Sequence, residues 1–316
     1  MPTLQKGAPS GRFSLWPATL SDMSSNRYPI LLPVAAMLGA ILSLCLGSTV
    51  AKQLFPIIGP SGTTALRVGF SAIVLCIVWR PWRYGWPQRA DWPRIVLYGS
   101  VLGLMNWMFY QAIRTIPFGL AVAIELIGPL GVAFLSSQRL SNVVWVLVAA
   151  GGLALLLPLA SVPQAGQLDP GGMMWAFSAA ICWGLYIVIG KGAQHLPSGQ
   201  LLPLGLGVAT LLIAPIGWAA AGTKMFTPNV LAIGLLVGIV SSAIPYTLEF
   251  FAIKRLPKYA FGTLAAIEPA VAAMVGWVTL GETLTARQIV AVALVMAASV
   301  GAVLTSRNQI EAAAPQ

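Results

Sequence analysis

The sequence predicts an all-α membrane protein whose ten transmembrane helices form two inverted repeats of five helices each. Three observations support this prediction: the composition, the number of long apolar runs and a weak internal repeat. Of the 316 residues, 58% are hydrophobic and only 8% are charged, whereas about a quarter of the residues in a typical soluble domain are charged. The composition therefore argues against a water-soluble domain, a disordered chain and a small disulfide scaffold.

Ten apolar runs are long enough to cross the bilayer, since about 20 residues span roughly 30 Å of hydrocarbon. In chain order they cover residues 30–51, 62–79, 95–113, 118–136, 143–159, 171–190, 200–221, 230–251, 259–280 and 286–305. The loops between them are short and rich in proline, glycine or charge, so we expect no soluble domain. We expect residues 1–28 to be a disordered cytoplasmic segment and residues 307–316 to be a cytoplasmic tail.

The positive charges predict the orientation of the chain in the membrane. If the N-terminus is cytoplasmic, thirteen Lys and Arg residues fall on the inner side and four on the outer side. Cytoplasmic loops carry an excess of Lys and Arg, so both termini are expected in the cytoplasm. This bias also accounts for the formal net charge of +10 without nucleic acid, because the cations do not form a basic stripe.

A shift of about 140 residues aligns the two halves of the chain, residues 29–160 and 170–306. The shift places residues 112–117 on 252–257 and Pro129 on Pro269. Because five spans are an odd number, the second half enters the membrane from the opposite side, which gives an inverted repeat. Such a repeat favours alternating access to a site near the midplane. A duplicated structural protein with no pathway is the alternative.

Four ionisable residues fall within predicted spans: Arg67, Glu125, Glu249 and Glu268. Each costs roughly 3 kcal/mol or more in hydrocarbon, so each is expected to face a polar cavity or a partner. Glu125 and Glu268 occupy related places beside intramembrane prolines, where a kink frees backbone carbonyls. We hypothesise that these two carboxylates bind a substrate ammonium group in competition with a proton. Arg67 would bind a carboxylate, so that the site recognises a zwitterion such as an amino acid.

Each of these residues has a structural alternative. Arg67 lies about five residues from the predicted outer end of its span and could extend to the interface. Glu249, close to the inner end of its span, could have a local surface role. Glu125 and Glu268 could form only interhelical hydrogen bonds. Glu282, just before the last span, is more typical of a carboxylate that caps a helix or turn.

Asn106, Tyr110 and Tyr246 are further candidates for a substrate site, and ordinary helix packing is the alternative for each. Gln111, Trp183 and Tyr186 are weaker candidates of the same kind. Glycines four residues apart in the third and eighth spans, at 99 and 103 and at 234 and 238, favour close helix packing. His195 is the only histidine and has no second ligand at metal spacing. We therefore expect no enzyme, no metal and no cofactor.

The motifs resemble the drug/metabolite transporter superfamily, in its EamA branch. The resemblance rests on the ten spans, the two halves and residues 280–285 after Pro269. Within that branch, residues 97–106, 121–129, 136–139, 245–249 and 261–269 are similar to bacterial inner-membrane exporters of threonine and homoserine. The resemblance covers about residues 29–305. The first half departs from the second by having Gln138 where the second half has Glu282.

The resemblance implies a secondary active transporter that exports small amino acids across the inner membrane, with protons as the coupling ion. Efflux of another metabolite or of an amphipathic drug-like compound is the alternative. The expected partners are a small-molecule substrate and the lipid bilayer, with no nucleic acid. A ten-span inverted repeat is a complete pathway, so we expect a monomer.

Overall fold

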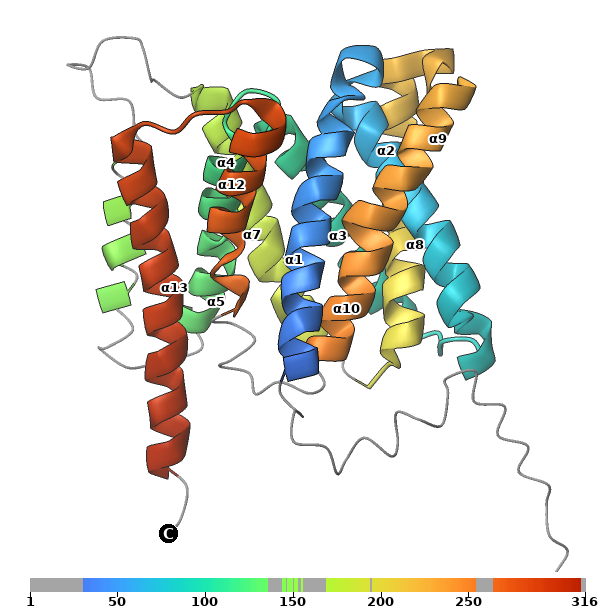
Figure 1. Ribbon diagram of the computed structural model, residues 1–316. Helices are drawn as coiled ribbons and strands as arrows, with labels where there is room; N and C mark the ends of the chain where they lie inside the picture. The colour runs from blue at the N-terminus through green and yellow to red at the C-terminus, as the bar shows by residue number, and fades with distance from the viewer. Residues whose placement is uncertain are drawn as a thin grey trace, which may run out of the picture.

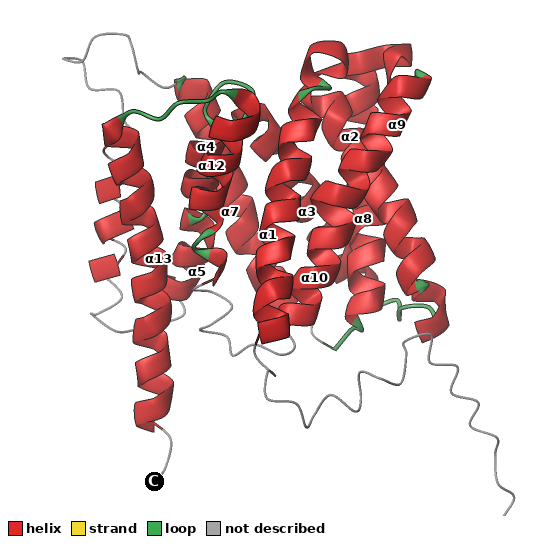
Figure 2. Cartoon of the chain, in the orientation of Figure 1, coloured by secondary structure: helices red, strands yellow, loops and turns green. Residues whose placement is uncertain are grey.

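The computed structural model describes residues 31–135, 144–145, 147–149, 151–152, 155, 169–193, 195–253 and 264–313. Within these ranges every regular element is a helix, and Figure 2 shows no strand. Five helices are long and apolar enough to cross a membrane: Leu31–Lys52, Phe55–Trp79, Pro170–Gly190, Gly199–Phe226 and Pro228–Glu249. Shorter apolar helices cover Phe118–Val132, Glu268–Leu280 and Ala286–Ala298. The predicted all-α class is confirmed for the described part of the chain.

The first half contains α1 (Leu31–Lys52), α2 (Phe55–Trp79), α3 (Trp92–Ala112), α4 (Phe118–Glu125) and α5 (Ile127–Leu135). The second half contains α7 (Pro170–Gly192), α8 (Ser198–Ala221), α9 (Pro228–Gly238), η5 (Ile239–Ala243), α10 (Ile244–Ile253), α12 (Glu268–Leu280) and α13 (Ala286–Ala313). Residues 1–28, most of the predicted span 143–159 and the start of the predicted span 259–280 lie outside the described residues.

Two predicted boundaries differ from the structure. The second span was expected to start at residue 62, but α2 starts at Phe55 and passes through a break at Gly59. Gly59 has a φ of 67°, a left-handed conformation that glycine adopts without strain. The last span was expected to end at residue 305, but α13 continues to Ala313. Both helices continue past residues that break the hydrophobic pattern, so composition alone did not locate their ends.

Proline explains the breaks in two other predicted spans. Pro129 has no N–H to donate to the carbonyl of Glu125 four residues earlier, and the helix is interrupted at Leu126, between α4 and α5. Pro245 likewise cannot donate to the carbonyl of Ser241, and the preceding residues form a π-helical turn, η5. Such turns interrupt α-helices frequently at functional sites.

The helices of the two halves pack against one another. α2 packs on α8, α3 packs on α7 and α8, and α1 packs on α10 and η5 (Figure 1). The short helix α4 packs on α12, and α13 contacts α4 and α5. One apolar cluster includes residues of α1, α4, α7 and α12, and a second includes residues of α2, α3, α8 and α9. This packing places helices from both halves around the buried charged residues.

Candidate functional site

Arg67 is buried in the middle of α2. Only 3% of its surface is exposed, and twelve residues separate it from each end of the helix, about 18 Å at 1.5 Å per residue. Its Nε donates to Ser242 Oγ at 2.9 Å and its Nη2 donates to the Ser241 carbonyl at 3.0 Å. Arg67 therefore does not extend to the interface, which was the alternative interpretation of this residue.

The Ser241 carbonyl is available to Arg67 because of the proline four residues later. In an α-helix that carbonyl would accept from residue 245, but proline has no N–H. The turn is also held from α1, where Ser43 Oγ donates to the Val240 carbonyl at 2.6 Å. Our sequence reasoning missed Ser241 and Ser242, although their position one turn before Pro245 was a usable signal.

Three carboxylates lie near Arg67 or near one another. The charge of Glu125 interacts with those of Arg67 and Glu268, and the charge of Glu268 interacts with that of Glu249. Glu125 is buried at 9% exposure, whereas Glu268 and Glu249 are half-buried. The structure thus brings together the four ionisable residues predicted from the spans, and Glu249 belongs to the same group.

The predicted aromatic and amide side chains join this group. The Arg67 guanidinium lies 5.0 Å from the centre of the Tyr110 ring, a distance at which cation–π attraction is significant. Tyr246 interacts electrostatically with Arg67, Glu125 and Glu249, and also with the Asn106 side chain. Asn106 is itself held by a hydrogen bond from Nδ2 to the Leu102 carbonyl at 2.8 Å. We call these seven residues the charged cluster: Arg67, Asn106, Tyr110, Glu125, Tyr246, Glu249 and Glu268.

Tyr110 has the clearest unused polar group in the charged cluster. Its side chain is fully buried, and its hydroxyl makes no hydrogen bond of normal geometry to a described residue, although it lies close enough to the Arg67 side chain to interact with it. An unpaired buried hydroxyl costs free energy, so such a group is usually paired with water, an ion or a ligand. The hydroxyl is therefore available to a bound molecule beside Arg67.

Two of the three weaker candidates, Gln111 and Tyr186, have partners of their own. Gln111 Nε2 and Trp107 Nε1 both donate to Ser61 Oγ, at 3.0 and 2.9 Å. Tyr186 accepts from the Tyr98 hydroxyl at 3.0 Å, and the two rings lie 4.9 Å apart. These contacts join α3 to α2 and α7, which is the packing role considered as their alternative.

Two charged contacts lie at the ends of the helices. Glu282 accepts from Lys52 Nζ at 2.5 Å and from the Phe118 backbone N–H at 2.7 Å, so it caps α4 rather than the helix that follows it. His195 Nε2 lies 2.7 Å from Asp91 Oδ1. Among the described residues, no group of three His, Cys, Asp or Glu side chains could hold a metal ion.

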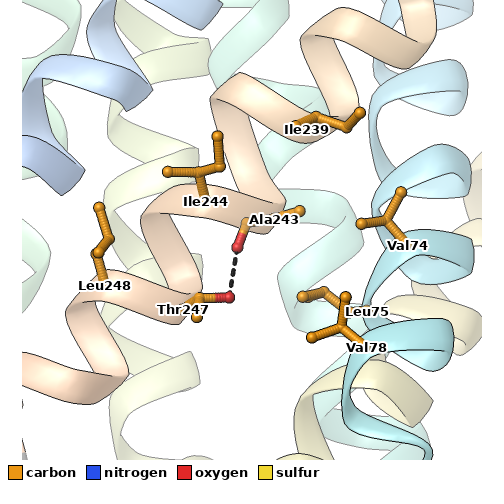
Figure 3. A pocket seen from close by; sticks show the side chains of 8 residues that line it. All are labelled: Val74, Leu75, Val78, Ile239, Ala243, Ile244, Thr247 and Leu248. Carbon is orange, nitrogen blue, oxygen red and sulfur yellow. Dashed lines mark hydrogen bonds between the residues drawn. The ribbon is translucent and has the colours of Figure 1, made fainter. Parts of the chain in front are cut away.

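An apolar groove of about 270 Å³ lies between α2 and the η5–α10 segment (Figure 3). Its lining residues are Val74, Leu75, Val78, Ile239, Ala243, Ile244, Thr247 and Leu248. Thr247, the only polar side chain among them, donates its hydroxyl to the Ala243 carbonyl at 2.7 Å. The groove contains no residue of the charged cluster and offers no group to neutralise a charged ligand.

A bundle of apolar helices around a buried cluster of both charges is typical of a membrane transporter. Comparison with known sequences identifies the class further. The profile of the EamA-like transporter family matches residues 170–304. The threonine/homoserine exporter RhtA of Escherichia coli K12 is 41% identical over 288 residues, which cover 90% of this chain and 96% of that protein. RhtA of Salmonella typhimurium SL1344 gives the same values.

More distant relatives agree with this assignment. The uncharacterized transporter YwfM of Bacillus subtilis is 26% identical over 251 residues, with 74% of this chain and 80% of that protein covered. One crystal structure of a protein superimposes with a TM-score of 0.57 at 19% identity, over 87% of this chain and 98% of that chain; this likeness concerns the fold alone. The chain belongs to the EamA-like transporter family. It is a multi-pass membrane transporter and not an enzyme.

Proposed function

We propose that this protein exports small amino acids of the threonine and homoserine type across the bacterial inner membrane in exchange for protons. The observation that carries the proposal is the charged cluster, in which the buried Arg67 lies near Glu125 and Glu125 lies near Glu268. A free amino acid carries one carboxylate and one ammonium group, so its charges complement a site with both signs. The 41% identity to RhtA, a named threonine/homoserine exporter, supports this substrate class.

In the proposed complex, Arg67 and the neighbouring Tyr110 hydroxyl donate hydrogen bonds to the substrate carboxylate. A guanidinium carries five N–H donors, and the bonds to Ser241 and Ser242 use two of them. Glu125 and Glu268 accept from the substrate ammonium group. Arg67 can balance the charge of only one of these two carboxylates in a poorly solvated site, so a proton takes the place of the ammonium group when the site is empty.

The proposed architecture is ten spans in two inverted five-helix repeats, divided at residues 29–160 and 170–306. In an inverted repeat, each helix has an equivalent in the other half. If both helices of a packed pair are replaced by their equivalents, the resulting pair should also pack together. The pair α3–α7 becomes α10–α1, the pair α5–α7 becomes α12–α1, and the pairs α2–α8 and α4–α12 map onto themselves. All of these contacts are present, as an inverted repeat requires.

The glycine pairs support the same exchange. Gly99 and Gly103 of α3 approach Gly205 and Ala209 of α8 so closely that added Cβ atoms would clash or need repacking. In the other half, Gly238 of α9 approaches the backbone of α2 in the same way. The third span of each half thus packs through small residues on the second span of the other half. We propose further that both termini are cytoplasmic and that the monomer is the working unit.

Counterflow of radiolabelled threonine and homoserine in proteoliposomes tests the proposal. The full chain is compared with Glu125→Gln and Glu268→Gln at several pH values, and Asp169→Asn serves as a control that removes a carboxylate outside the cluster. We expect saturable exchange that both cluster variants weaken and the control does not. No exchange by correctly folded protein would contradict the substrate assignment, and a screen of other metabolites and amphipathic drugs would follow.

A further inference from the structure

Three parts of the chain meet at Glu282, which lies between α12 and α13. One carboxylate oxygen accepts from Lys52 at the end of α1, at 2.5 Å, and the other accepts from the Phe118 N–H at the start of α4, at 2.7 Å. Lys52 and Glu282 are 230 positions apart in the chain, and their side chains are 19% and 18% exposed. The contact therefore joins the two halves in a partly desolvated environment, where an ion pair is stronger than at an open surface.

Two glycines build this contact. Gly281 has a φ of 65°, a left-handed conformation that turns the chain back at the end of α12, and the Glu282 N–H donates to the Gly276 carbonyl at 3.2 Å. A Cβ at Gly276 would lie 2.8 Å from Glu282 Oε2. The carboxylate reaches the start of α4 because residue 276 has no side chain in its path.

The position of Glu282 bears on the charged cluster through α4. This helix has only eight residues, from Phe118 to Glu125. The Phe118 N–H donates its hydrogen bond to Glu282. One end of α4 is thus fixed by Glu282 and the other end carries a cluster carboxylate. A movement of the α12–α13 turn relative to α1 would be transmitted over this short rigid length to Glu125.

We propose that Lys52 and Glu282 form a latch that closes one end of the bundle and must open each time substrate passes that end. The proposal rests on the transport function proposed above and adds its gate. In the open state the ion pair is broken, the turn between α12 and α13 moves away from α1, and α4 shifts with it. Glu282 is then a positioning residue that acts on Glu125 through α4.

The sequence makes this latch specific to one end of the molecule. Lys52 matches Lys191 in the repeat, but Gln138 stands where the second half has Glu282. A glutamine can accept a hydrogen bond but cannot form an ion pair. At these matched positions the first half therefore supplies no carboxylate to pair with Lys191, and breaking the Lys52–Glu282 pair favours opening at its own end.

Cys45 provides a native reporter of this opening. It lies seven residues before Lys52, on the same face of α1, it is fully buried, and its thiol interacts with the charge of Glu268. A full-length protein with Cys76→Ser and Cys182→Ser retains Cys45 alone, since these three are the only cysteines. The rate of its labelling by a sulfonated maleimide in nanodiscs measures how often water reaches the cluster.

We expect Lys52→Met and Glu282→Gln each to raise the Cys45 labelling rate about tenfold, which corresponds to about 1.4 kcal/mol of lost preference for the closed state. Glu282→Gln keeps an acceptor for the Phe118 N–H, so α4 stays capped and the fold is retained. Lys52→Arg keeps the ion pair and should label at the wild-type rate. Lys224→Met, which removes an exposed lysine of the 222–226 turn, should also leave the rate unchanged.

Unchanged labelling in both Lys52→Met and Glu282→Gln would overturn the latch, and so would an equal increase in Lys224→Met. Because the labelling needs no substrate, this result is independent of substrate identity. Failure of the wild-type protein to exchange threonine or homoserine would contradict the proposed function alone. Intact exchange with unchanged labelling would contradict the latch alone.

Discussion

Glu125 and Glu268 occupy related places in the two halves, but the chain supports them differently. Glu125 is the last residue of α4, with Pro129 four positions later. Glu268 is the first residue of α12, and Pro269 follows it directly. A carboxylate is disfavoured at the C-terminal end of a helix and favoured in the first turn, because of the helix dipole. Glu125 lies within electrostatic range of Arg67, whereas Glu268 is supported by the N-terminus of its own helix.

The difference teaches that two halves of one chain can place the same chemical group in a common cluster without giving it the same environment. Glu125 is buried and depends on a residue of another helix, Arg67. Glu268 is half-buried and has another carboxylate, Glu249, within electrostatic range. The two carboxylates should therefore respond unequally when their surroundings change.

The largest expected effect comes from removing Arg67, the cation that distinguishes the surroundings of Glu125 from those of Glu268. We expect Arg67→Met to lower threonine counterflow by about 100-fold or more, because the substrate carboxylate loses the buried cation proposed to bind it, and removing one partner of a buried charge pair costs about 2–5 kcal/mol. Arg67→Lys keeps the charge but loses the planar fork that reaches Ser241 and Ser242 together, so about a tenfold loss is expected. Ser242→Ala controls for the structural bond alone and should retain transport within about threefold. Arg67→Met with nearly normal transport would contradict this role.

Double-mutant cycles compare directly how strongly Arg67 is coupled to Glu125 and to Glu268. The cycle of Arg67→Lys with Glu125→Gln should show a coupling of about tenfold in counterflow rate, because these two charges interact. The cycle of Arg67→Lys with Glu268→Gln should be additive within about threefold. Equal coupling in both cycles would mean that Arg67 serves the two carboxylates alike, and the distinction between them would be wrong.

The sequence was sufficient to identify the four ionisable residues inside the spans, because the cost of burying a charge is a local property of each span. Arg67, Glu125, Glu249 and Glu268 could each be recognised from the hydrocarbon around them. Their mutual arrangement remained hidden, since Arg67 contacts Ser242 only when α2 packs on the π-helical turn η5. A pattern of hydrophobic residues does not encode which faces of two helices meet.

The ends of the helices show the same limit. The position of Glu282 just before the last span indicated a carboxylate suited to a cap, and the structure shows a cap on α4. Neither that helix nor Lys52 could be chosen from the sequence, because the contact joins residues 230 positions apart. Likewise, α2 starts at Phe55, before Gly59. Glycine usually ends a helix, but Gly59 lies at a break within this one.

A smaller effect is expected from replacing the two prolines beside the carboxylates, Pro129 and Pro269, which should differ in their importance for transport. Pro129→Ala restores an N–H that can bond to the Glu125 carbonyl, so α4 and α5 should join and turn the Glu125 side chain away from Arg67. We expect about a tenfold loss of transport, since interior proline changes an α-helix strongly. Pro269→Ala lies at the first turn of α12, where the missing N–H has no helical partner, and transport should stay within about threefold. Equal effects on counterflow would indicate that both breaks serve the cluster in the same way.

The smallest expected effect concerns Thr115, three residues before α4, whose side chain donates a hydrogen bond to Asp169. Hydrogen bonds from the Thr115 side chain and from the backbone of Gly172 and Gly171 lower the pKa of Asp169, with Thr115 the largest cause. A folded-state pKa below that of the unfolded chain stabilises the fold at neutral pH, and this contribution is lost as the pH falls through the folded value. Thr115→Val should therefore lower the melting temperature by about 1–2 °C at pH 7 and by less at pH 3. Transport should not change, because Asp169 lies outside the cluster. An equal loss of melting temperature at both pH values would mean that Thr115 acts through packing and not through the Asp169 carboxylate.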